Sequence, residues 1–286
     1  MLLRTLGCCL MLAVSSVAAQ EGRLLWLIND FPPFTEVSQQ TAGQGIADSL
    51  MQHVQSHLPQ YKHETEVASF ARVYALMERG EQVCHPTTLK MPGREHVMLF
   101  SLPALFLTSQ QVVIRADRQS RFAPYIDSSG QIDVSRLLGD AQLVTAVSER
   151  RGYSAAITNA LKALGDQPHV LKAGVNFNAP FQQLAAGWID YLFAYPVELG
   201  RYHRQQGVVE VAMQTLEIAG DPPYMLGYIS CTRSVWGEQV IRDIDEQIRL
   251  AGPRPPWVEK IVEYTASEDL ENYERALVEQ QPFSQR

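Results

Sequence analysis

The sequence predicts an α/β protein of two lobes, and two observations support this prediction. Apolar runs of strand length alternate with helix-length segments whose apolar residues share one face, the pattern of a mainly parallel sheet flanked by helices. The alternation starts again in the middle of the chain, after an extended stretch over 110–115 and a polar, turn-rich stretch over 120–130. A chain of 286 residues, 46% hydrophobic, is long enough to bury one large core or two modest ones.

The N-terminus has the pattern of an export signal. Arg4 precedes a short apolar run from Leu6 to Val14, and Val17-Ala18-Ala19 fits a small-residue cleavage site. The apolar run is too short to span a bilayer. We therefore expect residues 1–19 to be a cleaved signal peptide and the mature protein to be soluble and exported.

The first part of the mature chain predicts three strands and two helices. The apolar run from Leu24 to Asn29 is typical of a buried strand, and paired prolines soon after it forbid its continuation. Ser69 is placed to cap a helix that Gly80 ends. The expected elements are strands over 24–29, 63–67 and 81–85 and helices over 46–58 and 70–79.

The second part repeats the alternation and then turns helical. Ser154 is placed to begin a helix that Gly165 ends, and Asn178 to cap another that runs through Ala186. The remaining expected elements are strands over 143–147, 169–172 and 188–194, extended segments over 208–213 and 226–230, and helices over 236–250 and 258–264. Trp236 and Trp257 are expected to pack the last helices onto the first lobe.

Four cysteines divide into two pairs. Cys8 and Cys9 lie within the expected signal peptide, whereas Cys84 and Cys231 lie in strand-like segments. In an oxidising compartment a lone pair is a candidate disulfide, and two buried free thiols are the alternative. A bridge would require the two ends of the chain to share one domain.

Composition and motifs argue against several classes of function. The formal net charge is −7 and no basic stripe is present, which argues against nucleic acid as a partner. Neither a nucleophile-elbow motif nor a phosphate-binding glycine loop occurs. His53 and His57 share one helix face near His63, but no cysteine or carboxylate completes a set of ligands, so we expect neither a metal nor a cofactor.

The stretch from Lys90 to Pro103 is the most informative part of the chain. Arg94 follows a Pro-Gly turn and stands six residues before the sequence Phe-Ser-Leu-Pro that begins at Phe100. This arrangement resembles the signature of bacterial extracellular solute-binding proteins of the amino-acid-binding family, family 3. Further matches follow the same order along the chain: Phe31-Pro32-Pro33-Phe34, Asp48 after two glycines, Gly152-Tyr153-Ser154, and the segment from Ala186 to Asp190.

The resemblance covers nearly the whole mature chain and implies a type II, two-lobe periplasmic-binding-protein-like fold. In such a fold each lobe is a mainly parallel sheet flanked by helices, and two hinge segments join the lobes. The outer lobe would comprise residues 20–107 and 226–286, and the inner lobe residues 108–225.

The resemblance also implies a ligand site between the lobes. Arg94 would form paired hydrogen bonds with a ligand carboxylate, which its planar guanidinium suits. Phe31 would form an aromatic wall, and backbone N–H groups around Ser154 would offer a helix N-terminus to the same anion. The full expected set of ligand-binding residues is Phe31, Arg72, Arg94, Gly152, Tyr153, Ser154 and Tyr195, where Arg72 has the alternative of a solvated helix charge.

The sequence departs from the family where a ligand ammonium would bind. The family's aspartate falls on Tyr195, which does not replace an ionised carboxylate, and Glu198 is the nearest acid. An amino acid and a carboxylate or polar aromatic compound without an ammonium group are therefore both open as ligands.

Three functional classes remain. The first is a monomeric periplasmic receptor without chemistry of its own, which delivers an anionic or zwitterionic solute to an ABC importer or a membrane sensor, as in amino acid transport. The second is an exported enzyme on the same scaffold, similar to prephenate dehydratases, with Glu198 as the candidate acid. The third is an interaction module that has lost its ligand.

Overall fold

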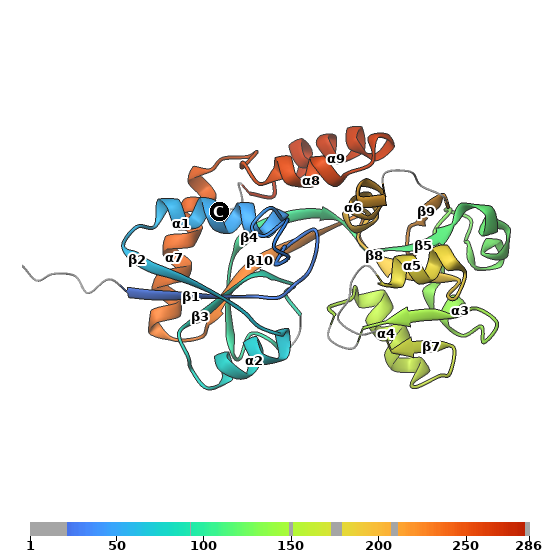
Figure 1. Cartoon of the computed structure of the whole chain (residues 1–286), viewed down its shortest axis with the longest axis horizontal. Helices are drawn as coiled ribbons and strands as arrows, with labels where there is room; N and C mark the ends of the chain where they lie inside the picture. The colour runs from blue at the N-terminus through green and yellow to red at the C-terminus, as the bar shows by residue number, and fades with distance from the viewer. Residues whose placement is uncertain (1–21, 92, 149–150, 173–178, 207–210, 284–286) are drawn as a thin grey trace, which may run out of the picture.

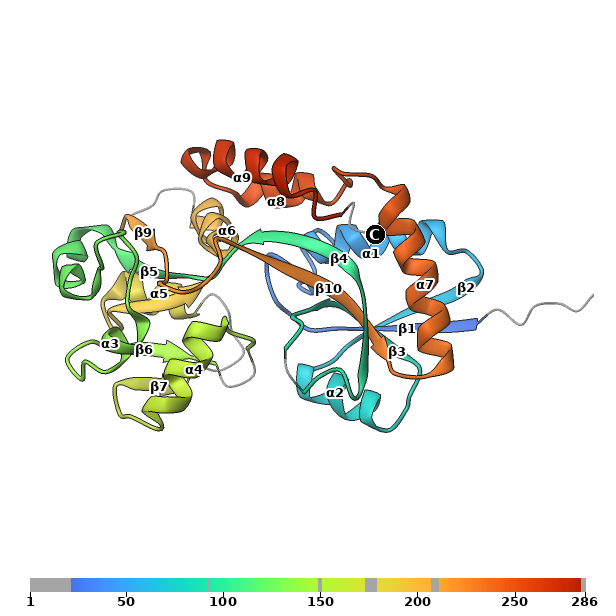
Figure 2. The same cartoon turned by 180° about the vertical axis from the view of Figure 1, so that it is seen from behind.

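The protein has two lobes, each built on one five-stranded sheet (Figures 1 and 2). The structure is a computed structural model, and it describes residues 22–91, 93–148, 151–172, 179–206 and 211–283. The expected signal peptide, residues 1–19, lies outside these ranges, as does the expected cap Asn178.

The outer lobe holds both ends of the described chain. Its sheet has the strand order β2-β1-β3-β10-β4. The strands are β1 (Gly22–Ile28), β2 (Tyr61–Val67), β3 (Val83–Thr88), β4 (Met98–Thr108) and β10 (Tyr224–Thr232). The helices are α1 (Ile46–His57), α2 (Phe70–Glu78), α7 (Val235–Leu250), α8 (Val258–Tyr264) and α9 (Ser267–Gln280).

The inner lobe is formed by the middle of the chain. Its sheet has the order β7-β6-β8-β5-β9. The strands are β5 (Gln111–Arg115), β6 (Thr145–Val147), β7 (Val170–Lys172), β8 (Tyr191–Ala194) and β9 (Met213–Leu216). The helical elements are the 3-10 turns η1 (Ala116–Arg121) and η2 (Ala123–Tyr125), and the helices α3 (Val134–Leu138), α4 (Ala155–Leu164), α5 (Ala179–Ala186) and α6 (Pro196–Gln206).

The prediction of two α/β lobes with mainly parallel sheets is confirmed, and each sheet contains one antiparallel strand. Strands β1, β2 and β3 pair in parallel, as do β6, β7 and β8. Strand β10 is antiparallel to β3 and β4, and β5 is antiparallel to β8 and β9. The chain crosses to the inner lobe from β4 to β5 and returns from β9 to β10, so the strands that carry the crossings run in opposite directions.

The two crossings lie side by side. The Ser109 N–H donates to the Pro223 carbonyl oxygen at 3.0 Å, and the Ser109 hydroxyl donates to the carbonyl of Pro222. We propose that these paired segments are the hinge, and that the lobes divide near residues 107 and 226.

The disulfide predicted for the outer lobe is confirmed. Cys84 and Cys231 are joined by an S–S bond of 2.00 Å. The two residues lie directly opposite one another on the antiparallel strands β3 and β10, and both are fully buried. The bridge therefore ties the returning C-terminal part of the chain to the N-terminal part of the outer sheet.

Helix α6 was not expected from the sequence, and it packs against the outer lobe although it follows an inner-sheet strand. Its residue Gly200 approaches the backbone of Tyr264 in α8 so closely that an added Cβ would lie 1.9 Å from the Tyr264 carbonyl oxygen. Both views place α6 beside α8, next to the crossing strands (Figures 1 and 2). The terminal helices also cover the outer core as predicted, because the Trp257 indole is buried and donates to the Ala104 carbonyl oxygen at 2.7 Å.

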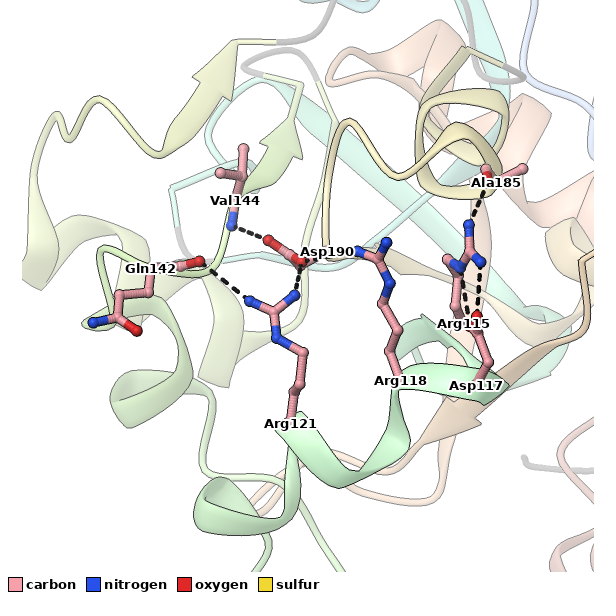
Figure 3. A network of polar contacts seen from close by, with 8 residues as sticks. All are labelled: Arg115, Asp117, Arg118, Arg121, Gln142, Val144, Ala185 and Asp190. Atoms are coloured by element: carbon pink, nitrogen blue, oxygen red, sulfur yellow. Dashed lines mark hydrogen bonds and ion pairs between the residues drawn. The ribbon is translucent and has the colours of Figure 1, made fainter.

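The strand expected over 188–194 is wrong at its start. Trp188 is 74% exposed, and the strand begins only at Tyr191, because Gly187 and Trp188 form the turn that leaves α5. Asp190, which the family comparison placed in this strand, precedes it and serves the inner lobe's structure (Figure 3). Its carboxylate accepts the Val144 N–H at 2.9 Å and pairs with Arg121 of η1.

Over the described residues, no helix combines the length and the apolar character that crossing a membrane requires.

Candidate functional site

A cavity lies between the two lobes, at the ends of the outer-sheet strands that face the inner lobe. Its volume is about 90 Å³. The lining from the outer lobe is Asn29, Phe31, Phe34, Phe70, His85, Thr87, Thr88, Leu89, Arg94, Leu105, Leu107 and Gly227. The lining that follows the first crossing is Arg151, Gly152 and Tyr195. A second cavity on the inner-lobe side shares Arg94, Arg151 and Gly152 with the first, so these three residues stand where the two spaces meet.

Arg94 reaches the cavity from the turn between β3 and β4. The turn is closed by the Arg94 N–H, which donates to the Met91 carbonyl at 3.2 Å, and by the Met98 N–H, which donates to the Arg94 carbonyl at 3.0 Å. One guanidinium nitrogen donates to the Leu89 carbonyl at 3.0 Å, and the guanidinium carbon lies 4.7 Å from the centre of the Phe70 ring. Burial lowers the pKa of Arg94 from its ordinary value.

The Arg94 guanidinium has no carboxylate partner among the residues that the structure describes. Its hydrogen bond goes to the neutral carbonyl oxygen of Leu89. An arginine held in this way, with donors left over at a cavity, is placed to receive a planar anion through paired hydrogen bonds.

Phe31 reaches the cavity from the loop after β1. The loop turns back on itself, because the Thr35 N–H donates to the Phe31 carbonyl at 3.0 Å, and the Phe31 ring packs 4.8 Å from that of Phe34. Asp48 in the first turn of α1 fixes the end of the loop by accepting the N–H groups of Glu36 and Gly45, each at 2.9 Å. Any residue other than glycine at position 45 would clash with this loop, since an added Cβ would lie 2.3 Å from the Phe34 carbonyl oxygen.

The sequence did not predict a buried ion pair that lies beside the cavity. The Arg151 guanidinium forms two hydrogen bonds with the Glu198 carboxylate, one of 2.7 Å from Nη1 to Oε1 and one from Nη2 to Oε2. The side chains are 8% and 3% exposed. Burial alone would lower the pKa of Arg151, but the charge of Glu198 and the hydrogen bonds to it outweigh burial and raise that pKa. Arg151 therefore stays charged inside the protein.

Three aromatic rings surround this guanidinium. The Arg151 guanidinium carbon lies 5.3 Å from the ring centre of Phe31 and 5.6 Å from those of Tyr153 and Tyr195. Burial raises the pKa of Tyr195, and also that of Tyr153, whose hydroxyl oxygen accepts the Ser148 N–H at 2.9 Å. Both phenols are therefore neutral, and their rings offer π faces to the arginine.

Ser154 does not offer a helix N-terminus to the cavity. It caps α4 as expected, with its hydroxyl accepting the Ile157 N–H at 3.3 Å, but it is buried and absent from the cavity lining. Its own N–H donates to the Gln110 side chain at 2.8 Å, and the Ala156 N–H donates to Asp221 at 3.3 Å. The expectation that this helix start binds the ligand anion is therefore wrong for the Ser154 and Ala156 N–H groups, because protein acceptors already occupy them.

Arg72 also lies away from the cavity. Its side chain is 58% exposed and pairs with Glu66 at 3.0 Å. The alternative of a solvated helix charge is the correct one. Of the other expected residues, Phe31, Arg94, Gly152 and Tyr195 line the interlobe cavity and Tyr153 lines the adjoining one.

Two polar residues that line the cavity, His85 and Asn29, carry no charge. His85 is 1% exposed, and its Nδ1 accepts the Thr87 N–H at 3.2 Å, so Nε2 carries the proton toward the Asn29 side-chain oxygen at 3.0 Å. Burial, with a smaller contribution from the charge of Arg94, lowers the pKa of His85 to about 4. The histidine is thus neutral at physiological pH and positions Asn29.

His63, one of the histidines considered for a metal, is engaged by groups of the protein. Both ring nitrogens of His63 are occupied, one by the Trp26 indole N–H at 3.1 Å and the other by the Leu58 carbonyl at 3.0 Å. No group of three potential metal ligands occurs within the part of the chain that the structure describes.

Comparison with known proteins gives structural likenesses alone. No family model matches the chain, and no curated protein does. A mutant of ArgBP from T. maritima superposes with a TM-score of 0.62 at 17% identity, over 85% of this chain and 95% of that one. The amino acid ABC transporter substrate-binding protein AbpA from Streptococcus pneumoniae, bound to L-arginine, gives a TM-score of 0.60 at 16% identity, over 90% and 96%.

A periplasmic domain is equally similar. The periplasmic VFT2 domain of BvgS from Bordetella pertussis gives a TM-score of 0.60 at 16% identity, over 86% of this chain and 94% of that domain. Identities this low establish the fold and nothing more specific. The chain therefore has the type II two-lobe fold shared by periplasmic solute-binding proteins and related sensor domains.

Proposed function

We propose that this protein is an exported receptor that captures a small carboxylate-bearing solute between its lobes. The observation that carries the proposal is Arg94, whose guanidinium lines the interlobe cavity without a carboxylate partner among the described residues. A buried cation of this kind gains most from an anionic ligand, because the desolvation it has already undergone strengthens each new charge-assisted hydrogen bond.

The charges around the cavity support an anion. Its described lining contains two arginines, Arg94 and Arg151, and no aspartate or glutamate. Arg151 is neutralised by Glu198, and His85 is neutral, which leaves Arg94 as the unbalanced charge of that lining.

The structural neighbours support a binding role with a membrane partner. One of those found is described as an amino acid ABC transporter substrate-binding protein, and another as a histidine kinase sensor domain with similarity to periplasmic binding proteins. We infer that this receptor is monomeric and periplasmic, and that it presents its closed form to an ABC importer or a membrane sensor.

The enzymatic alternative has less support. Glu198 was its candidate acid, yet both carboxylate oxygens accept hydrogen bonds from Arg151, and Oε2 also accepts the Tyr195 N–H at 2.8 Å. Both oxygens of this carboxylate are therefore engaged by donors of the protein, which leaves neither of them placed to act on a substrate.

Two measurements test the receptor proposal. Native mass spectrometry of the purified mature protein should detect a small molecule that is lost on denaturation, and calorimetry with that compound should give its affinity. Arg94→Ala should weaken binding by roughly 2 to 5 kcal/mol, the usual cost of leaving one member of a buried charge pair alone. Arg72→Ala, on the neighbouring surface, is the matched control and should bind as the wild type does. An Arg94→Ala protein with unchanged affinity would contradict the proposal.

A further inference from the structure

The cleft already contains a cation that belongs to the protein. The Arg151 guanidinium lines the interlobe cavity and is paired with Glu198 through two hydrogen bonds. The pair joins residues 47 positions apart in sequence, from the loop before α4 and the first turn of α6.

The surroundings of this guanidinium have the composition of a binding site for an organic cation. The rings of Phe31, Tyr153 and Tyr195 lie 5.3 to 5.6 Å from it, and a carboxylate meets its two terminal nitrogens. Aromatic faces combined with a carboxylate are what proteins use to hold ammonium and guanidinium ligands. Here the occupant is a side chain of the protein.

Occupation by Arg151 has a consequence for any ligand. The described lining of the cavity contains no aspartate or glutamate. Glu198, the carboxylate that pairs with the lining residue Arg151, is already engaged by Arg151 and by the Tyr195 N–H. A ligand cation entering beside Arg151 would meet two like charges, Arg151 and Arg94, and no free carboxylate of that lining. Burying an unpaired charge in this way is strongly unfavourable.

One donor of Arg151 remains for a ligand. Its Nε is buried and has no hydrogen-bond partner among the described residues. A buried donor without an acceptor costs free energy, which a ligand oxygen at that position would recover. Together with Arg94, this donor favours a ligand that brings acceptors.

We propose that Arg151 is a built-in occupant of the cation position of the cleft, so that the site takes carboxylates without an ammonium group and rejects the corresponding amino acids. This ligand class rests on the proposed receptor function. A separate test, which does not depend on that function, asks whether a free guanidinium compound can replace the Arg151 side chain beside Glu198.

The first test removes the occupant and supplies a substitute. Arg151→Ala should bind methylguanidinium, measured as a rise in the melting temperature in millimolar methylguanidinium chloride above that in equal sodium chloride. The affinity should exceed that of the wild type by about tenfold or more, since the wild-type position is filled. The double variant Arg151→Ala, Glu198→Gln should lose the response, because the carboxylate that receives the cation is gone.

A loss of folding does not end this test. If Arg151→Ala is unfolded alone, the same probe is added during refolding, and recovery of the native circular dichroism spectrum supports the proposal. A folded Arg151→Ala protein that methylguanidinium does not stabilise, or an unfolded one that it does not restore, overturns the proposal.

The second test concerns the ligand class in the wild type. Calorimetry compares L-lactate with L-alanine and L-phenyllactate with L-phenylalanine. In each pair the first compound carries a hydroxyl group where the second carries an ammonium group. At least one hydroxy acid should bind about tenfold or more tightly than its amino acid. An amino acid that binds as tightly as its partner overturns the ligand class. If no member of the four binds, the ligand class is rejected for these sizes, whereas the methylguanidinium response still decides whether Arg151 is an occupant.

Discussion

Arg201 of α6 and Glu36 of the loop after β1 form a buried ion pair across 165 residues of sequence. Two guanidinium nitrogens of Arg201 meet the two oxygens of Glu36, one of them at 2.9 Å, and the side chains are 8% and 4% exposed. Glu36 is itself held by Asp48, which accepts its N–H. The pair thus fastens α6 to the same outer-lobe loop that carries Phe31 into the cavity.

Breaking this pair should destabilise the protein strongly. Arg201→Met leaves the Glu36 charge buried without its guanidinium partner, and we expect the free energy of unfolding to fall by about 3 to 5 kcal/mol. Urea denaturation measures this loss. Arg204→Ala is the matched control on the same helix, because Arg204 is 58% exposed and its pair with Glu263 is 3.8 Å long, so its effect should stay within about 1 kcal/mol.

A compensating change separates pairing from packing. Glu36→Leu combined with Arg201→Met removes both charges, and most of the stability should return because no unpaired charge is left. If the double variant were as unstable as Arg201→Met alone, the lost stability would come from packing rather than from the charge.

Gly200 should resist replacement by alanine. In the interior of a helix this change ordinarily stabilises by up to about 1 kcal/mol. Here the new Cβ would lie 1.9 Å from the Tyr264 carbonyl oxygen, so α6 and α8 must separate. We expect the free energy of unfolding to fall by roughly 1 to 3 kcal/mol, the usual cost of overpacking. A stabilised Gly200→Ala protein would show that α6 does not pack on α8 at this point.

The disulfide should be present and stabilising in the mature, signal-free protein. Thiol titration after denaturation without reductant should find essentially no free thiol, because Cys84 and Cys231 are bonded to each other. Replacing both by alanine should cost about 2 to 5 kcal/mol, since the bridge closes a loop of 147 residues in the unfolded chain. Two reactive thiols per oxidised chain would refute the bond.

Much of the fold could be predicted because local chemistry determines it. Ser69 and Ser154 were recognisable as helix caps, and each accepts a backbone N–H from the first turn of its helix. Arg94 was recognisable because the sequence around it, up to Phe-Ser-Leu-Pro, resembles the solute-binding-protein signature, and its side chain lines the interlobe cavity.

The rest depended on contacts that no local pattern reveals. Helix α6 was missed because the buried positions of its first turns include Glu198 and Arg201, so it lacks the apolar stripe that marks a helix in a sequence. Each of these charges is buried because a partner distant in sequence, Arg151 or Glu36, pairs with it. Glu198 was consequently considered only as an acid for a ligand or a substrate, and Arg151 was not singled out.

His85 should make stability depend on pH. In the folded protein its pKa is about 4, because burial disfavours the charged imidazole, against 6.5 for the ordinary side chain. The unfolded chain therefore binds the extra proton between pH 6.5 and pH 4, and stability falls as the pH is lowered through this window. Above pH 6.5 both states are neutral at this histidine and the contribution is complete.

The expected size of this loss is about 3 kcal/mol from pH 6.5 down to pH 4, from the difference between the two pKa values. His85→Gln keeps a polar side chain beside Asn29 but cannot take up a proton, so its stability should fall less over the same interval. Since the carboxylates titrate in both proteins, the difference between their urea-unfolding curves at several pH values isolates the histidine. His96→Gln changes an exposed imidazole and should follow the wild type. Parallel pH profiles for the wild type and His85→Gln would mean that the buried imidazole accepts a proton as readily as an exposed one. In that case burial would not keep His85 neutral in the cavity.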